Sequence, residues 1–363
     1  MGMLSLRYVR EIATTTTLGC ALVMGAAMGT LGCKKLLKGK GSGDAGAGTT
    51  TTAGTPQDDA DEQMQDKIEA YIVCLNTLSS PVHATRARYL SWVDVKKGVT
   101  GNERVVLGVL DLPKDSAQKC SAGLSKAKGM PPKDAKLESA GDDFARTVTD
   151  LDAVIDEAFP YYDQKNFKDD KFAKGKALHP RLMAAFTAFS KADNNMHATL
   201  DAITKPLAQR ALARIDREEG KKFRFHRKHV LLTARELVEA GDPVGDDDNI
   251  DVALFNGMFT EYDKALNELQ GYGALHKNDL DAQTNPAWPL AKSHFDQFDR
   301  AAETYRKKAR EYNRCLRDAP TKAKAANGKV DPDKLPPCPD GKPRDVVSKY
   351  NEFIRSSNDN QFP

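Results

Sequence analysis

Apolar residues recur alternately four and three positions apart from Ala291 to Leu316, through almost four heptads. Because 3.6 residues make one turn of an α-helix, this spacing places them all on one helix face. The residues of this face are Ala291, Phe295, Phe298, Ala302, Tyr305, Ala309, Tyr312 and Leu316. A helix with a narrow apolar stripe must bury that stripe against a neighbour, so this segment favours a fold made of helices packed on helices.

Similar stripes predict helices in most of the remaining chain. They lie at residues 64–78, 144–162, 182–203, 231–238, 254–269 and 346–354. Asp59 and Asp61 are candidate caps for the first of these helices. Proline lacks the backbone N–H that a helix interior needs, so we expect Pro81 to interrupt the first helix and Pro206 to kink or end the third.

Two segments near the start of the chain have weaker patterns. Residues 115–127 predict a brief helix that carries Cys120, whereas residues 96–113 favour a loop. Together with the stripes, these patterns predict an all-α fold, an elongated bundle of long antiparallel helices.

The N-terminal segment predicts export. Its apolar run from Leu18 to Cys33 follows two arginines and is shorter than the ~20 residues that a membrane-spanning helix needs. The run ends in Thr30-Leu31-Gly32-Cys33, which resembles the lipobox of bacterial lipoproteins with its leucine one place nearer to the cysteine than usual. We expect a signal peptide over residues 1–32 and lipid modification of Cys33. The alternative is an uncleaved or ordinarily cleaved signal in which Cys33 is incidental.

Residues 33–57 indicate a flexible tether, because Gly, Thr and Ala dominate them. The root-mean-square reach of such a segment is ~27 Å. Lys34 stands where an Asp often retains lipoproteins in the inner membrane, so the resemblance implies the outer membrane rather than the inner one. Residues 58–363 form the predicted helical domain, with two subdomains joined near residues 206–250 as a variant of this organisation.

Cysteine parity is consistent with export. If Cys20 is removed with the signal peptide and Cys33 carries lipid, four cysteines remain: Cys74, Cys120, Cys315 and Cys338. In an oxidising compartment they predict two disulfides, and three connectivities are open. Proximity in the sequence favours Cys74 with Cys120 and Cys315 with Cys338, and free buried thiols are the alternative.

The charge balance argues against a nucleic-acid partner. The net charge is +3, and residues 1–32 hold two arginines and one glutamate, so their removal leaves +2. A protein that binds nucleic acid normally has a strongly basic surface.

One cluster of aromatic and acidic residues is a candidate ligand site. The segment YYDQKNFKDD contains Tyr161, Tyr162, Phe167, Asp169 and Asp170 where one predicted helix ends and another begins. Such a cluster suits a sugar, a peptide or a cation. In the alternative interpretation, Tyr162 and Phe167 pack the corner of the bundle, and Asp169 or Asp170 caps the next helix.

Other candidate sites lack the spacing that their chemistry requires. His226 and His229 lie three apart without the glutamate of a zinc-protease helix, and their basic surroundings indicate a solvated helix face. Residues 246–248 and Asp251 are acidic but lack the glycine and glutamate of a calcium-binding loop, so capping of a helix near Ile250 explains them better. We therefore expect no catalytic residue, no metal ion and no cofactor.

Three motifs, in this order, resemble the YiiG-like lipoprotein family, whose domain has no known function. They are YIVCLN at 71–76, YYDQKNFKDD at 161–170 and YNEFI at 350–354, and the similarity runs from about residue 62 to 358. The resemblance implies a lipid-anchored, mostly helical envelope protein, and it supplies no catalytic residues.

These observations predict a lipid-anchored protein of the bacterial envelope that acts as a non-catalytic binding or scaffolding module. Its expected partners are the membrane, through the N-terminal lipid, and an envelope protein or the cell wall. The alternative is an envelope hydrolase or metal-dependent enzyme whose site is assembled from residues distant in the sequence.

Overall fold

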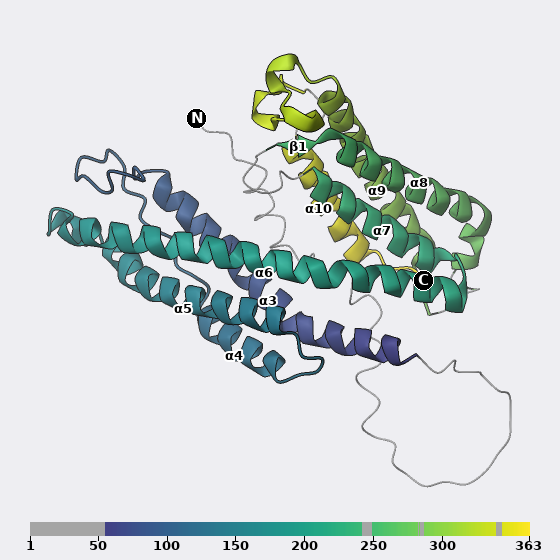
Figure 1. Ribbon diagram of the computed structural model, residues 1–363, viewed down its shortest axis with the longest axis horizontal. Coiled ribbons are helices and arrows are strands. Elements are labelled where there is room, and N and C mark those ends of the chain that lie inside the picture. Colours follow the sequence, from purple (N-terminus) through teal and green to yellow (C-terminus); the bar gives the residue numbers. More distant parts are fainter. Residues whose placement is uncertain (1–54, 242–248, 282, 284–286, 339–342) are drawn as a thin grey trace, which may run out of the picture. The chain divides into compact units, whose positions relative to one another are not determined.

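The computed structural model describes residues 55–241, 249–281, 283, 287–338 and 343–363. The predicted signal peptide, Cys33 and most of the predicted tether lie outside these ranges. The α-helices in the described part are α3 (Pro56–Leu90), α4 (Ser116–Lys128), α5 (Ala135–Asp163), α6 (Ala173–Glu219), α7 (Phe223–Ala240), α8 (Val252–His276), α9 (Ala291–Arg317) and α10 (Pro343–Asp359) (Figure 1). One antiparallel sheet pairs β1 (Ile250–Asp251) with β2 (Lys329–Val330). The all-α prediction is confirmed.

The described chain divides into two compact units, and the division falls within α6 between Lys205 and Pro206. We call residues 55–205 the N-terminal unit and residues 206–363 the C-terminal unit.

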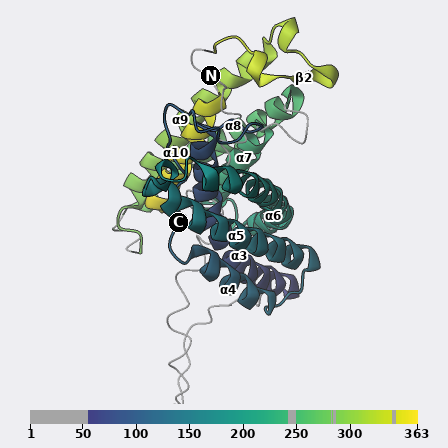
Figure 2. The same cartoon turned by 90° about the vertical axis from the view of Figure 1, so that its left-hand side faces the viewer.

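In the N-terminal unit, α4 packs against both α3 and α5 (Figure 2). The stripes predicted for α3, α5 and α6 supply its core, since their fully buried side chains include Ile68, Leu78, Phe144, Leu151, Ile155, Leu182, Phe186 and Phe189. The Cys74–Cys120 disulfide joins α3 to α4 across a Cα–Cα distance of 4.9 Å.

Helix α3 begins earlier than the sequence predicts, so the last residues assigned to the tether belong to the helix. Thr55 is its N-cap, and the Thr55 and Asp58 side chains each accept from the other's backbone N–H in a capping box. Pro56 follows at the first helical position, where its missing N–H has no cost. Asp59 and Asp61 are therefore not the caps.

Neither internal proline ends its helix. α3 continues through Pro81 to Leu90, and α6 continues through Pro206 to Glu219. In α3, Leu78 and Val82 flank the proline and are both fully buried. An internal proline costs about 3 kcal/mol, and burying two such aliphatic side chains contributes a similar amount, so packing holds α3 together.

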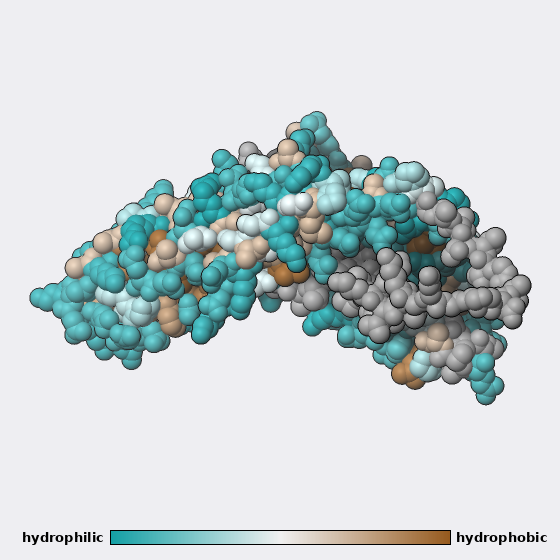
Figure 3. Space-filling view, turned by 90° about the horizontal axis from the view of Figure 1, so that it is seen from below, coloured by the Kyte–Doolittle hydropathy of each residue, from teal (hydrophilic) through white to brown (hydrophobic). Residues whose placement is uncertain are grey.

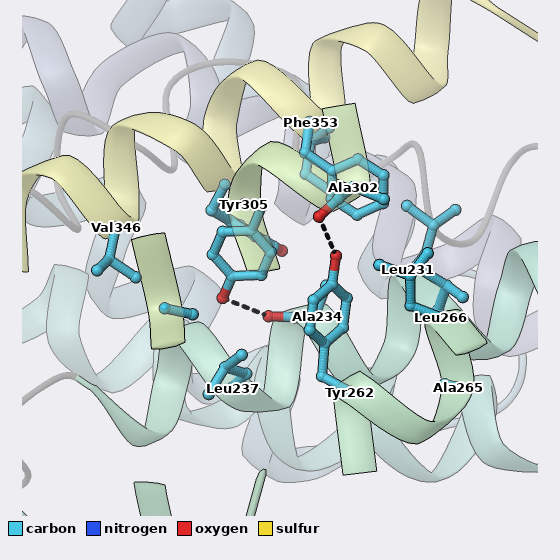
Figure 4. Close-up of a cluster of buried hydrophobic side chains, with 14 of the residues drawn as sticks. Leu231, Ala234, Leu237, Tyr262, Ala265, Leu266, Ala302, Tyr305, Val346 and Phe353 are labelled. Carbon is cyan, nitrogen blue, oxygen red and sulfur yellow. Dashed lines mark hydrogen bonds between the residues drawn. The ribbon is translucent and has the colours of Figure 1, made fainter. Parts of the chain in front are cut away.

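In the C-terminal unit, α8 packs against α7 and α9, and α10 packs against α9 and α7. The predicted stripe of α9 is confirmed, because each of its eight residues is buried. Two tyrosines in this core donate to backbone carbonyls of neighbouring helices (Figure 4): Tyr262 to Ala302 at 2.8 Å and Tyr305 to Ala234 at 3.2 Å. The two hydroxyls are therefore paired, and they tie the helices together.

The segment that follows α9 folds back onto the unit. β2 pairs with β1 just before α8, and Cys315 in α9 forms a disulfide with Cys338 across a Cα–Cα distance of 6.3 Å. Asp251 caps α8 by accepting from Leu254 N–H at 2.9 Å, as the sequence predicts, whereas residues 246–248 lie outside the described residues. Both cysteine pairs thus have the connectivity that proximity in the sequence favours.

Candidate binding surface on the loop between α3 and α4

The structure places the YYDQKNFKDD motif at the turn from α5 through the 3-10 helix η1 (Asn166–Lys168) to α6. The Tyr161, Tyr162 and Phe167 side chains are buried, while Asp169 is exposed. Asp170 accepts from the Tyr161 hydroxyl and from the Lys174 backbone N–H, both at 2.8 Å, and so caps α6. The three aromatic side chains thus pack the corner rather than face solvent, as in the packing interpretation of the motif.

The electrostatics of this corner agree with its hydrogen bonds. Burial and the hydrogen bond to Asp170 raise the pKa of Tyr161 to about 12. Burial opposes ionisation of Asp170, but the hydrogen bonds from Lys174 and Tyr161 outweigh it and lower the pKa of Asp170. The pair is therefore held as a neutral phenol that donates to a carboxylate.

Tyr162 lies at the centre of a larger aromatic cluster that the sequence did not reveal. Its ring centroid is 5.3 Å from Trp92, 6.4 Å from Tyr89 and 6.4 Å from Phe167. Burial raises the pKa of Tyr162 well above its ordinary value and that of Tyr89 to about 12. These residues come from α3, the segment after it, the end of α5 and η1, so periodicity within one helix gave no signal for the cluster.

This cluster supports the irregular loop of residues 91–115, which joins α3 to α4. From Val99 to Leu112 the loop makes no backbone–backbone hydrogen bond within the part of the chain that the structure describes. Side chains anchor it instead. The Thr85 hydroxyl donates to Leu110 O at 2.8 Å and accepts from Leu110 N–H at 2.7 Å, and Arg88 Nε donates to Leu107 O at 2.8 Å.

Two further anchors use ring nitrogens. Trp92 Nε1 donates to Gly108 O at 3.0 Å. His179 of α6 lies with Nε2 3.2 Å from Val95 O and with Nδ1 3.0 Å from the Tyr89 hydroxyl. Because a carbonyl only accepts, the proton lies on Nε2, and Nδ1 accepts from the tyrosine.

The loop backbone lies too close to the cluster for larger residues. At Gly108, where φ is +67°, a Cβ atom would lie 2.7 Å from Tyr162 Cβ. At Gly98, where φ is +68°, it would lie 2.8 Å from His179 Cδ2. Both glycines are therefore needed for conformation and for close approach.

Two carboxylates fix the tip of the loop. Asp94 accepts from the backbone N–H groups of Lys97 and Lys96, which lower the pKa of Asp94. Burial opposes ionisation of Glu103, but hydrogen bonds from Thr100 and Gly101 outweigh it and lower the pKa of Glu103. The loop conformation is thus defined by local contacts as well as by anchors on α3 and α6.

The loop exposes four aliphatic side chains among its polar ones. Val95, Val105, Leu107 and Leu110 are 53%, 59%, 41% and 36% exposed, and together we call them the loop surface. They are four of the eight large hydrophobic residues that are exposed in the described chain. On the face drawn in Figure 3, hydrophilic residues predominate and hydrophobic ones form small separate patches. A fixed loop that concentrates aliphatic side chains in water has the character of a protein-binding surface.

The prediction of a solvated face around His226 and His229 is wrong. His226 is 7% exposed and packs 5.1 Å from the Tyr272 ring, and burial lowers the pKa of His226. Burial also lowers the pKa of His229, and that of Lys228 to about 8. The sequence held a signal for this, because His226 lies three residues after Phe223 and four before Val230, on the buried face of α7.

The core of the N-terminal unit contains a contact between histidine and aspartate side chains. His83 Nε2 is 3.2 Å from Asp193 Oδ2, and His197 Nε2 is 3.8 Å from Asp193 Oδ1. His83 and Asp193 are almost fully buried, and their contact links α3 to α6. Across the described ranges, no group of three or more His, Cys, Asp and Glu residues is arranged to hold a metal ion.

The fold and the cysteine pairing define an all-helical protein with a disulfide in each of two units. The chain belongs to the family described as "Protein of unknown function (DUF3829)", whose model matches residues 62–359. It is also 31% identical over 187 residues to the "Uncharacterized protein YiiG" of Escherichia coli (strain K12), which confirms the YiiG-like resemblance. The match covers 51% of this chain and 53% of the relative, so the chain spans about half the length of this curated relative.

No solved structure gives a significant match to this chain. None of the helices that the structure describes is both long and apolar enough to cross a membrane.

Proposed function

We propose that this protein is a lipid-anchored component of the bacterial envelope that acts as a non-catalytic binding or scaffolding module. The observation that carries the proposal is the loop surface, where Val95, Val105, Leu107 and Leu110 are exposed on a fixed backbone. A surface that is already ordered loses little conformational entropy when a partner binds. More of the free energy gained from the aliphatic contacts therefore remains as binding free energy. The proposed partner of this surface is another envelope protein.

The cysteines support the envelope location. Cys74, Cys120, Cys315 and Cys338 are all paired in the structure, and such disulfides persist in oxidising compartments. Cys33 is then the cysteine available for lipid after a signal peptide of residues 1–32 is removed. The proposed destination is the outer membrane, with residues 33–54 as the tether that leads to α3.

Site-directed photocrosslinking tests the binding proposal. A photoreactive phenylalanine analogue is placed at Val105 and, as a matched control, at Val73, which is 51% exposed on α3. In intact cells we expect one discrete envelope protein to crosslink from position 105 and not from position 73. The added substitution Leu107→Asp should abolish that product. Equal labelling from both positions, or a product insensitive to Leu107→Asp, would contradict a docking role for the loop surface.

Mass spectrometry of the mature N-terminus tests the anchor separately. We expect the mature chain to begin at an acylated Cys33 and the protein to fractionate with outer membranes. Cys33→Ala should release it from the membrane fraction. An unmodified Cys33, or a mature chain that begins elsewhere, would remove the anchor from the proposal without affecting the loop surface.

A further inference from the structure

The C-terminal unit carries a surface hollow of about 240 Å³ beside the start of α9 and the end of α10. Its lining comes from two segments of the chain: Trp288, Pro289, Leu290 and His294 at the start of α9, and Asn358, Asp359 and Gln361 at the end of α10. None of these residues belongs to the loop surface or to a motif identified in the sequence.

The lining residues at the end of α10 are held in place by their neighbours. Phe362 is 2% exposed and packs edge-on against Phe295 and Phe298, with centroids 5.5 Å and 5.4 Å away. His294 Nδ1 donates to Gln361 O at 2.7 Å, and Asn360 Nδ2 donates to Ser356 O at 2.8 Å. Residues 358–361 therefore keep a fixed position, as a preformed site requires.

The residues just before α9 supply the apolar part of the lining. Trp288 is half-buried and packs on the core of the unit, so its indole is supported from beneath. Leu290, beside it, is 60% exposed. An aromatic ring held in this way offers a flat apolar platform to a ligand.

The polar side chains are complementary to hydroxyl groups. Among the described residues, none forms a hydrogen bond or ion pair with the side chains of Asn358, Asp359 and Gln361. Two amides both donate and accept, and the carboxylate accepts, so together they match hydroxyls, which also do both. The carboxylate disfavours phosphate or another anion, and a wholly apolar ligand would leave the amides unpaired.

We propose that this hollow binds a neutral sugar ring of a glycan chain, with the apolar face of the ring on Trp288 and its hydroxyls bonded to Asn358, Asp359 and Gln361. A small, mostly apolar concavity with a few convergent polar groups is the usual form of a small-ligand site. The inference concerns the C-terminal unit alone, and it depends neither on the lipid anchor nor on the loop surface.

The chain contains two tryptophans, Trp92 and Trp288, which makes ¹⁹F NMR of the protein labelled with 5-fluorotryptophan a direct test. The substitution Trp92→Phe assigns the two resonances. The probes are triacetylchitotriose and cellotriose, each titrated to about 10 mM, a range that detects weak millimolar binding. We expect at least one of them to shift the Trp288 resonance saturably while the Trp92 resonance stays in place.

Asp359→Ala should weaken the binding about tenfold, since a hydrogen bond to a charged group is lost. Asp318→Ala is the matched control, because this exposed aspartate follows the opposite end of α9, and it should leave the affinity unchanged. Both carboxylates are at the surface, so folding is preserved. Absence of a Trp288 shift with either saccharide would overturn the proposal, and so would an affinity that Asp359→Ala leaves unchanged.

Discussion

The substitution Thr85→Val tests whether side chains of α3 hold the loop surface in place. Thr85 is fully buried, and its hydroxyl forms two hydrogen bonds to Leu110, one to the carbonyl at 2.8 Å and one from the N–H at 2.7 Å. Valine has nearly the same shape, so the change removes both bonds without opening a cavity. Two backbone groups of Leu110 then lose their partner.

An unpaired buried polar group costs about 1–3 kcal/mol. Leu110 is partly exposed, so water replaces some of the lost bonding. We therefore expect a total loss in the lower half of the summed range, about 2–4 kcal/mol. The matched control is Thr77→Val in the same helix. Thr77 is exposed and donates only to Val73 O, four residues earlier, so we expect its loss to stay below about 0.5 kcal/mol.

Hydrogen exchange measured by mass spectrometry, together with urea unfolding, separates two ways in which the loss can appear. If the loop detaches locally, peptides covering residues 104–112 lose protection while the urea midpoint changes little. If the loop unfolds only with the N-terminal unit, the midpoint falls as well. Both results support the reasoning. If Thr85→Val and Thr77→Val give the same exchange and the same midpoint, the two bonds to Leu110 do not hold the loop.

Three other outcomes follow from the structure. Lys67 is fully buried and donates to Met130 O, Pro132 O and Glu138, so Lys67→Met should cost about 3 kcal/mol or more in urea unfolding, whereas Lys128→Met at an exposed ion pair should cost far less. Replacing Cys315 and Cys338 together by serine should cost about 3 kcal/mol, from the loop-closure entropy of their 23-residue separation, and a midpoint equal to wild type would refute this. The pKa of Asp170 in the folded protein lies below its value of about 3.9 in the unfolded chain. The ionised Asp170 therefore stabilises the fold fully above about pH 3.9, and this stabilisation is lost as the pH falls through the folded-state pKa. Exchange at residues 161–174 should therefore rise only in acid, and Asp170→Asn should remove that rise.

Periodicity predicted the helices well because burial of a stripe decides where a helix packs. The residues expected on the inner face of α9 are all buried, and the two disulfides join the cysteines nearest in sequence. The expectation that Pro81 interrupts its helix is wrong because burial also decides whether a helix continues. Pro81 has an unfavourable local propensity, but the buried neighbours Leu78 and Val82 outweigh it, and such tertiary contacts are not visible in a local rule.

Buried polar residues were beyond prediction. Lys67 and Thr85 occupy helix positions where a polar residue is normally solvated, and their partners lie more than 20 residues away in the sequence. Only the folded chain shows that Lys67 meets the carbonyls of the α4–α5 turn. The hollow near Trp288 was missed in the same way, because it joins the start of α9 to the end of α10.

The loop of residues 91–115 is unusual in a physical sense. Ordering a residue costs about 1–2 kcal/mol of backbone entropy, and this segment gains no compensation from helix or extended sheet pairing beyond the single bridge between Asp94 and Gly98. Long irregular segments in compact units are usually either disordered or functional. Here anchors such as the buried Thr85 and the part-buried Trp92 hold the backbone, while the loop turns aliphatic side chains to water, which opposes folding. An arrangement that is unfavourable for the isolated protein becomes favourable when a partner covers those side chains. We therefore propose the loop, rather than the buried YYDQKNFKDD corner, as the docking site.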